Sequence, residues 1–242
     1  MMKSGIDQDA LITMFAEASA KQGEALRKAV SEATLRALQG RELTLDNIKK
    51  VVKNVAEAAS TGIARNPAPA IDVEGLLGKA LGGIDAALLQ AVEANRKALE
   101  QFVNGGVSLT EKPLKEALAN IEKMEDVFFA AVTKASESAG PLQGPWQSAL
   151  DAMKMKGSAT GNQATQTVEQ LMSQAQTMMR EGRASGMRAA QAMLDNYAAL
   201  ASGVLIGMSE GLQAGTKRSG GSAAPAPAPA AAKTSASRGR RR

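Results

Sequence analysis

Cysteine and histidine are both absent from the 242 residues of the chain. Without cysteine, the protein forms no disulfide and has neither a thiol nucleophile nor a thiolate metal ligand. Without histidine, it lacks the side chain that changes charge near neutral pH and the commonest protein ligand for zinc. Carboxylates, amines, hydroxyl groups and Tyr197 remain for chemistry. The sequence therefore predicts a protein that is not an enzyme and that holds no metal or cofactor.

Aromatic residues are also scarce, at 2% of the chain. Alanine, leucine, valine and methionine supply most of the apolar side chains, which suits thin contact layers between long helices better than one thick core. No segment of useful length alternates polar and apolar residues as a half-buried strand does. We predict an all-α protein, an elongated bundle of amphipathic helices with a long C-terminal helix. The amino-terminal segment lacks the pattern of a secretory signal, so we expect a cytoplasmic location.

The positive charge is concentrated at the carboxyl end. The net charge is +5, but residues 217–242 carry seven lysines and arginines and no acidic residue, which leaves −2 for residues 1–216. Glycine, serine, alanine and proline make up the rest of this tail, which cannot bury enough apolar area to offset the entropy of ordering. We predict a disordered tail in which Arg238, Arg240, Arg241 and Arg242 contact nucleic acid phosphates or another acidic surface. A tail that only solubilises the protein is the alternative.

Apolar residues recur at three- and four-residue steps in five regions, which predicts five long helices. Their ranges are 7–39, 45–63, 73–103, 114–135 and 164–212, and a short helix is expected over 146–156. Thr44 and Thr110 are suited to cap the second and fourth of the long helices. We accordingly divide the chain into a helical region (1–139), a linker with a short helix (140–163), a long glycine- and methionine-rich helix (164–216) and the tail (217–242).

Glycines stand four residues apart in three stretches, which belong to two of the predicted helices. Each costs about 1 kcal/mol of helix stability relative to alanine, so a compensating contact is expected. A groove lined by glycine lets another backbone approach closely, either within the bundle or between protomers. A lipid- or polymer-facing groove is the alternative, and in the packing interpretation Gly207→Leu lowers the stability or the oligomer size. The residues are Gly78, Gly82, Gly182, Gly186, Gly203, Gly207 and Gly211.

The last predicted helix also carries a row of flexible apolar side chains, which adapt to irregular apolar partners. Those expected at the surface are Met172, Met179, Met193, Val204 and Met208, although an ordinary core stripe has the same spacing. The apolar run near residue 205 is too short for a membrane-spanning helix. Trp146, expected in a loop, either fills a helix junction or anchors the protein at an interface.

Residues 164–242 resemble the phasins, bacterial proteins that coat polyhydroxyalkanoate storage granules. The resemblance is carried by the alanine-, glutamine- and methionine-rich helix, the phrase "AQAMLDNYAALASGVLIGMSEGLQ" and the Ala-Pro, Lys and Arg tail. It implies a cytoplasmic protein, often oligomeric, that adsorbs to a polyester–water interface and has no catalytic residues. The glycine-striped last helix and the separate amino-terminal helical region depart from that pattern.

Two functions follow from these observations as hypotheses. The preferred one is a homo-oligomeric protein that coats a hydrophobic polymer or lipid surface, because amphipathic helices can exchange contacts among themselves for contacts with such a surface. The other is a self-associating helical scaffold or nucleoid-associated protein, whose tail binds nucleic acid without sequence preference.

Overall fold

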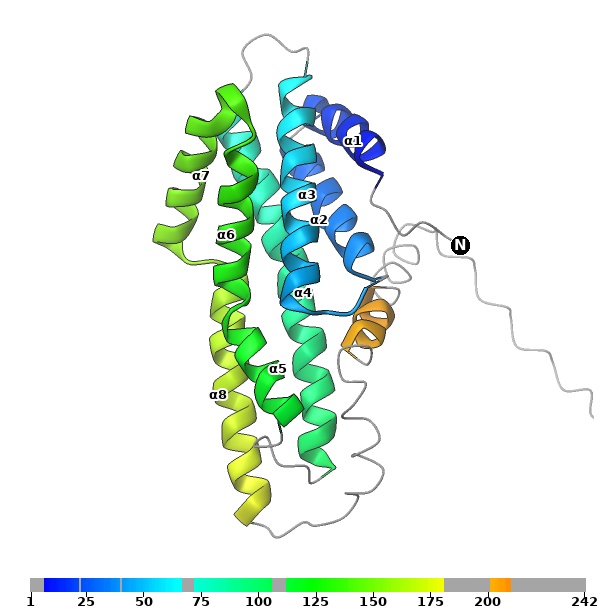
Figure 1. The fold of residues 1–242 in the computed structure, drawn as a ribbon, viewed down its shortest axis with the longest axis vertical. Coiled ribbons are helices and arrows are strands. Elements are labelled where there is room, and N and C mark those ends of the chain that lie inside the picture. The colour runs from blue at the N-terminus through cyan, green and yellow to red at the C-terminus, as the bar shows by residue number, and fades with distance from the viewer. Residues whose placement is uncertain are drawn as a thin grey trace, which may run out of the picture.

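The computed structural model describes residues 7–21, 23–39, 41–66, 72–105, 112–180 and 201–209. Within these ranges the chain forms helices and no strands, so the all-α prediction is confirmed (Figure 1). Residues 201–209 form a short helical segment. The other elements are α1 (Gln8–Lys21), α2 (Gly23–Gln39), α3 (Leu45–Ala64), α4 (Val73–Asn104), α5 (Lys112–Glu122), α6 (Met124–Ser136), the 3₁₀ helix η1 (Gly140–Leu142), α7 (Gln143–Lys156) and α8 (Ala159–Arg180).

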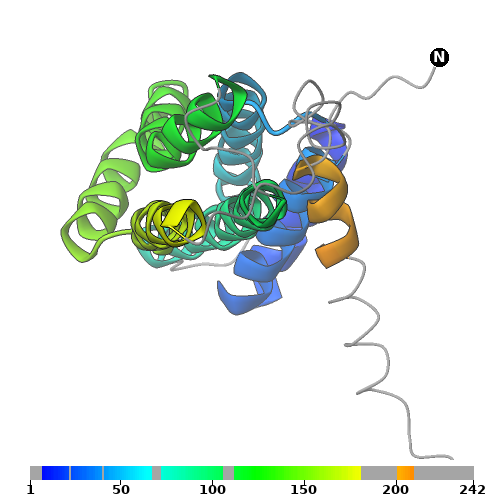
Figure 2. The same ribbon diagram turned by 90° about the horizontal axis from the view of Figure 1, so that it is seen from below.

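Helix α4 is the central element of an elongated bundle (Figure 1). It packs against α2, α3, α5, α7 and α8, while α3 also packs against α1 and α6. The view along the long axis shows α1 and α2 on one side of α4 and the helices from α5 to α8 on the other (Figure 2). Because α4 contacts both groups, it joins the two sides of the bundle.

The core is built mainly from alanine, valine, leucine and isoleucine, which form one cluster through the bundle. Phe15, Phe128 and Trp146 are its largest fully buried side chains. Trp146 lies in α7 and not in a loop, and its Nε1 donates a hydrogen bond to Ser60 Oγ of α3 at 2.7 Å. A buried indole needs such an acceptor for its polar edge. Trp146 therefore fills a helix junction, and the alternative of an exposed interfacial anchor is wrong.

The second and third predicted helices are confirmed as α3 and α4. Thr44 caps α3, because its side chain accepts a hydrogen bond from the backbone N–H of Asn47 at 3.3 Å. Asp72 caps α4 in the same way, with the N–H of Gly75 at 2.9 Å. Such side chains satisfy amide groups that have no partner within the first turn of a helix.

Two of the predicted single helices are each divided in the structure. The first, expected over 7–39, becomes α1 and α2, and these pack against different partners, α3 and α4 respectively. Gly23, a poor helix former, begins α2. The fourth is divided into α5 and α6 at Lys123, which lets α6 pack against α3 while α5 contacts α8. Periodicity alone missed both divisions because each pair of segments keeps helical spacing across the junction. The predicted cap Thr110 lies outside the described residues.

The predicted linker over 140–163 is mostly helical. Helix α7 begins at Gln143, three residues earlier than expected, and α8 begins at Ala159, inside the polar segment expected as a connection. Gly157 joins the two helices with φ of +76°, a conformation that glycine adopts without strain.

The last predicted helix, over 164–212, is not one straight helix. Gln174 of α8 hydrogen-bonds to Asn104 near the end of α4, whereas Ser209 contacts Gln39 in a groove that Gln90 also lines. A straight helix would place residues 174 and 209 about 52 Å apart, but Gln90 and Asn104 are separated by only about 21 Å of helix. Residues 201–209 therefore lie back along the bundle (Figure 1).

Candidate functional site

The glycines predicted to mediate close helix contacts do not do so within the described part of the chain. A Cβ atom added at Gly78, Gly203 or Gly207 would meet nothing within 4 Å, and one at Gly82 would meet only the Arg27 side chain at 3.6 Å. Among the described residues, these four glycines thus have no close packing role, and Gly207→Leu meets no described atom with which to clash. Gly182, Gly186 and Gly211 lie outside the described residues. A role between protomers stays a prediction.

Two other glycines make close contacts with the backbone of a neighbouring helix, and Gly161 of α8 makes one with the Glu125 carboxylate. A Cβ added at Gly62 of α3 would lie 2.8 Å from Phe15 Cβ and 3.0 Å from the Ala16 backbone nitrogen of α1. A Cβ at Gly83 of α4 would lie 2.5 Å from the Arg27 backbone oxygen of α2. Gly62 and Gly83 each stand within the apolar stripe of their helix, which is the sequence signal that a search for repeated glycines overlooks.

The methionine row is only partly at the surface. Met172 of α8 is 47% exposed, as predicted. Val204 and Met208 are half-buried and pack against the core, so their interpretation as surface residues is wrong. Met193, the Met179 side chain and the tail residues Arg238, Arg240, Arg241 and Arg242 lie outside what the structure describes. Met155 of α7, which was not predicted, is 89% exposed.

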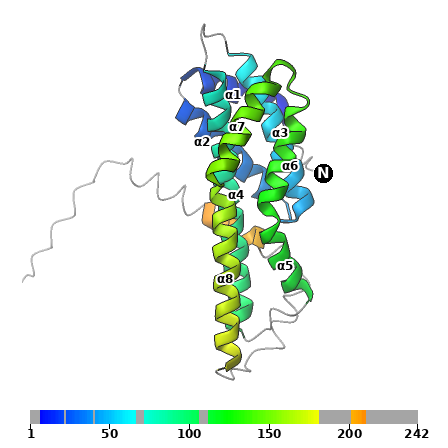
Figure 3. The ribbon, with the colours of Figure 1, turned by 90° about the vertical axis from the view of Figure 1, so that its left-hand side faces the viewer.

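Helix α8 lies beside α4 along the lower part of the bundle (Figure 3). Its buried face consists of small or polar side chains apart from one leucine: Thr160, Ala164, Thr167, Leu171 and Ala175. The Thr167 side chain is fully buried, and its Oγ1 has no hydrogen-bond partner among the described residues. A buried hydroxyl without a partner costs about 1–3 kcal/mol. Over residues 159–177, the docking face of α8 is therefore weak.

The start of α8, in contrast, is held by carboxylates from two other helices. Asp85 of α4 accepts hydrogen bonds from the backbone N–H groups of Ala159 at 2.9 Å and Thr160 at 3.0 Å. Glu125 of α6 accepts a hydrogen bond from the Ser158 hydroxyl at 2.5 Å. Negative charge at a helix N-terminus is favourable because the unpaired amides carry partial positive charge. The sequence signal was an acidic residue, Asp85, inside the apolar stripe of α4.

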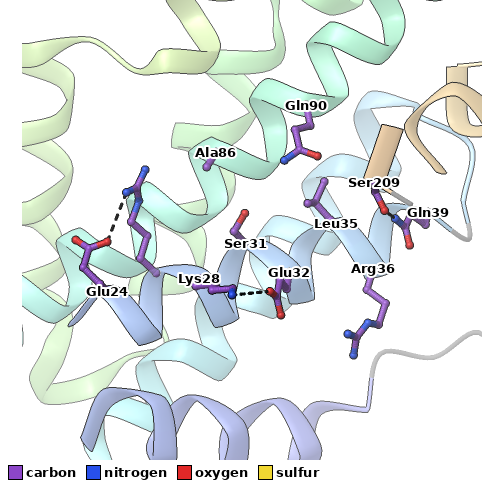
Figure 4. A pocket seen from close by; sticks show the side chains of 11 residues that line it. Glu24, Lys28, Ser31, Glu32, Leu35, Arg36, Gln39, Ala86, Gln90 and Ser209 are labelled. Carbon is purple, nitrogen blue, oxygen red and sulfur yellow. Dashed lines mark hydrogen bonds and ion pairs between the residues drawn. The ribbon is translucent and has the colours of Figure 1, made fainter. Parts of the chain in front are cut away.

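A groove of about 330 Å³ lies between α2, α4 and the 201–209 segment (Figure 4). Its charged residues pair along α2: Arg27 with Glu24 at 3.6 Å and Lys28 with Glu32 at 3.9 Å. The ion pairs are exposed, and such pairs contribute little to stability. Within the described residues, no group of acidic side chains suited to hold a metal ion occurs in the groove or elsewhere.

The clearest electrostatic network lies on α4. The Arg96 guanidinium contacts Glu93 at 2.9 Å and also pairs with Glu100. Burial alone would lower the pKa of Arg96, but the hydrogen bonds and charges of the two glutamates raise it. All three residues share one helix face at spacings of three and four, so this network stabilises α4 and does not form a reactive site.

Among the described helices, α4 alone has the length and the apolar composition that a membrane-spanning helix needs. More than half of that segment, 56%, is buried inside the protein, which is also what the core helix of a bundle requires. The finding does not assign a location.

Comparison with known proteins identifies one family. The model of DUF6781, a family of unknown function, matches residues 1–214 and so ends close to the start of the basic tail at residue 217. No curated protein and no solved structure matches the chain. None of these comparisons links the chain to the phasins.

Proposed function

Since the chain belongs to the DUF6781 family, whose function is unknown, we propose a function from its own residues. The protein is a non-enzymatic binding protein that coats a hydrophobic surface in the cytoplasm, such as that of a storage granule, through amphipathic helices. The contact element is α8, and the observation that carries the proposal is its weak docking face.

Adsorption requires the bundle to exchange internal contacts for external ones. Among the described residues, only Met155 and Met172 are large apolar side chains that are well exposed. The described part of the bundle therefore offers little apolar area, and a described helix that contacts the surface has to present a face that it now buries. A helix that buries little apolar side-chain area is a good candidate for this exchange.

Helix α8 buries few apolar side chains for its length among the described residues. Burial of one leucine side chain is worth about 1.5–3 kcal/mol, which is comparable with the penalty for the unpaired Thr167 hydroxyl. At 100° per residue, its apolar residues fall within an arc of about 100°, with Met172 at the exposed edge. A flat apolar surface can cover the whole arc. The residues of this arc are Ala164, Val168, Leu171, Met172 and Ala175.

The test compares Met172→Glu with Met155→Glu in binding of the full chain to polyester particles and to uncharged lipid vesicles. A charge within the proposed contact face should weaken binding at least tenfold, since it replaces about 1.5–3 kcal/mol of methionine burial. Met155→Glu is the matched control, because Met155 is more exposed but belongs to α7. Equal effects of the two variants, or none from either, would remove α8 as the contact element.

A second function is supported by the charge of the tail. Seven cations without an acidic residue, at 217–242, suit a self-associating scaffold or nucleoid-associated protein that binds nucleic acid. Replacement of Arg238, Arg240, Arg241 and Arg242 by serine should then abolish salt-sensitive DNA binding and leave particle binding unchanged. Particle binding that disappears with these arginines would favour this second function. Fluorescent labelling of the full chain in cells separates granules from nucleoid.

A further inference from the structure

Every amide group in the first turn of α8 has a partner. Asp85 accepts from the N–H groups of Ala159 and Thr160, and its own backbone oxygen accepts from Thr160 Oγ1 at 3.0 Å. The Ser158 hydroxyl accepts from the Gly161 N–H at 2.8 Å while it donates to Glu125. This set of bonds ties the start of α8 to α4 and α6 at the same place.

The rest of α8 lacks comparable attachments. Beyond the first turn, its described polar contacts with other helices are a hydrogen bond from Gln163 to Glu93 and one from Gln174 to Asn104 at 2.8 Å. Leu171 is the only large side chain that α8 buries completely among the described residues. The attachment of α8 is therefore concentrated at Asp85 and Glu125.

Because Asp85 is buried, its carboxylate is either bonded to the α8 amides or exposed to water. Its side chain is buried, with the residue only 6% exposed, and a buried carboxylate is tolerated only while hydrogen-bond donors surround it. If the amides of Ala159 and Thr160 leave, Asp85 has to be hydrated, so that water enters the α4 face that α8 had covered. Gly157, with its positive φ, lies directly before this point and separates the movement of α8 from α7.

We infer that Asp85 and Glu125 form a latch that keeps α8 docked on the bundle, and that opening of this latch releases α8 while α1 to α4 stay folded. Release frees the apolar arc of α8 for the hydrophobic surface. This last step rests on the proposed function, whereas the latch itself does not.

Hydrogen exchange on the full chain tests the latch. In Asp85→Asn, one carboxylate oxygen is replaced by an amide donor, and we expect the amides of residues 164–177 to exchange at least tenfold faster. The amides of residues 51–59 in α3 should keep their rates. Asp126→Asn is the matched control, because Asp126 is an exposed acid beside Glu125 and should change neither.

Unchanged exchange in α8, or equal acceleration in α8 and α3, would overturn the latch. If Asp85→Asn prevents folding, Glu125→Gln and Thr160→Val can be used, because each removes a smaller part of the same set of hydrogen bonds. Their effect is measured by hydrogen exchange in residues 164–177 and 51–59. Particle binding separates this inference from the function. Faster α8 exchange with about tenfold tighter particle binding supports both, and faster exchange with unchanged binding keeps the latch and overturns the coating role.

Discussion

Helices α3 and α8 are similar in length but are held in place by different means. Helix α3 buries large branched side chains along its length, including Ile48, Val51, Val52 and Val55. Helix α8 buries threonines, alanines and one leucine, and carboxylates from elsewhere in the chain hold its start. Packing energy is spread along α3 and directed bonds are concentrated at one end of α8. A bundle can therefore contain a permanent helix and a detachable one.

Removal of a large buried side chain should give the largest effect, and the loss should differ between the bundle core and α8. Leu88→Ala in α4 empties a completely buried site, and we expect a loss of about 2–5 kcal/mol in the free energy of unfolding. Leu171→Ala should cost less than about 2 kcal/mol, because α8 can separate without unfolding the rest. Urea denaturation measures both, and equal losses would show that α8 belongs to the same cooperative unit.

Two glycines of α4, Gly83 and Gly78, test where close backbone contact holds the bundle together. Gly83→Ala should destabilise the protein by about 1–3 kcal/mol, because its Cβ would meet the Arg27 backbone oxygen at 2.5 Å. Gly78→Ala, five residues earlier with open space around it, should stabilise by up to about 1 kcal/mol. Thermal denaturation gives the signs. Stabilisation by Gly83→Ala would mean that α2 and α4 can separate freely.

Thr167→Val should give α8 a buried branched apolar side chain of the kind that holds α3 in place. The exchange keeps the shape of the side chain and removes a buried hydroxyl without a partner, so we expect a gain of about 1 kcal/mol in α8 docking. Slower hydrogen exchange in residues 164–177 is the measurement. A loss of stability would show that the hydroxyl has an acceptor that the described residues do not supply.

The smallest effect concerns the exposed pair of Glu24 and Lys79, which joins α2 to α4. The hydrogen bond and charge of Lys79 lower the pKa of the Glu24 carboxyl from its usual 4.5. Its contribution to stability is thus complete above pH 4.5 and is lost as the pH falls through the lowered pKa of the folded state. Comparison of Glu24→Gln with the unmodified chain at pH 7 and at a pH below the lowered pKa of Glu24 should show a small difference only at pH 7. A difference that persists at low pH would assign the effect to packing.

The sequence predicted the helices that carry a long apolar stripe and a cap. Val73 to Val103 and Leu45 to Ile63 are found almost as expected because burial on a helix face imposes a strong 3.6-residue period. The divisions at Gly23 and Lys123 could not be predicted, because they depend on which neighbour each half packs against.

The candidate site was less accessible to sequence analysis. Repeated glycines drew attention, yet the two that matter inside the bundle, Gly62 and Gly83, are identified only by the backbone that lies against them. Asp85 and Thr160 are 75 residues apart, and no local pattern indicates a hydrogen bond between them. The polar segment around Ser158 suggested a linker because capping residues and linker residues have the same composition.

The separation of Asp85 from its partners also bears on the order of events during synthesis. Helix α4 is complete at residue 104, but Ala159 and Thr160 are added to the growing chain much later. Until then the Asp85 carboxylate has no donors from α8 and has to remain in contact with water. The face of α4 that carries it thus stays hydrated while α1 to α3 assemble around the rest of the helix. Contacts between distant segments form slowly, and domains are built from the amino terminus as the ribosome delivers them. On this order of assembly, α8 docks only after α1 to α4 have come together.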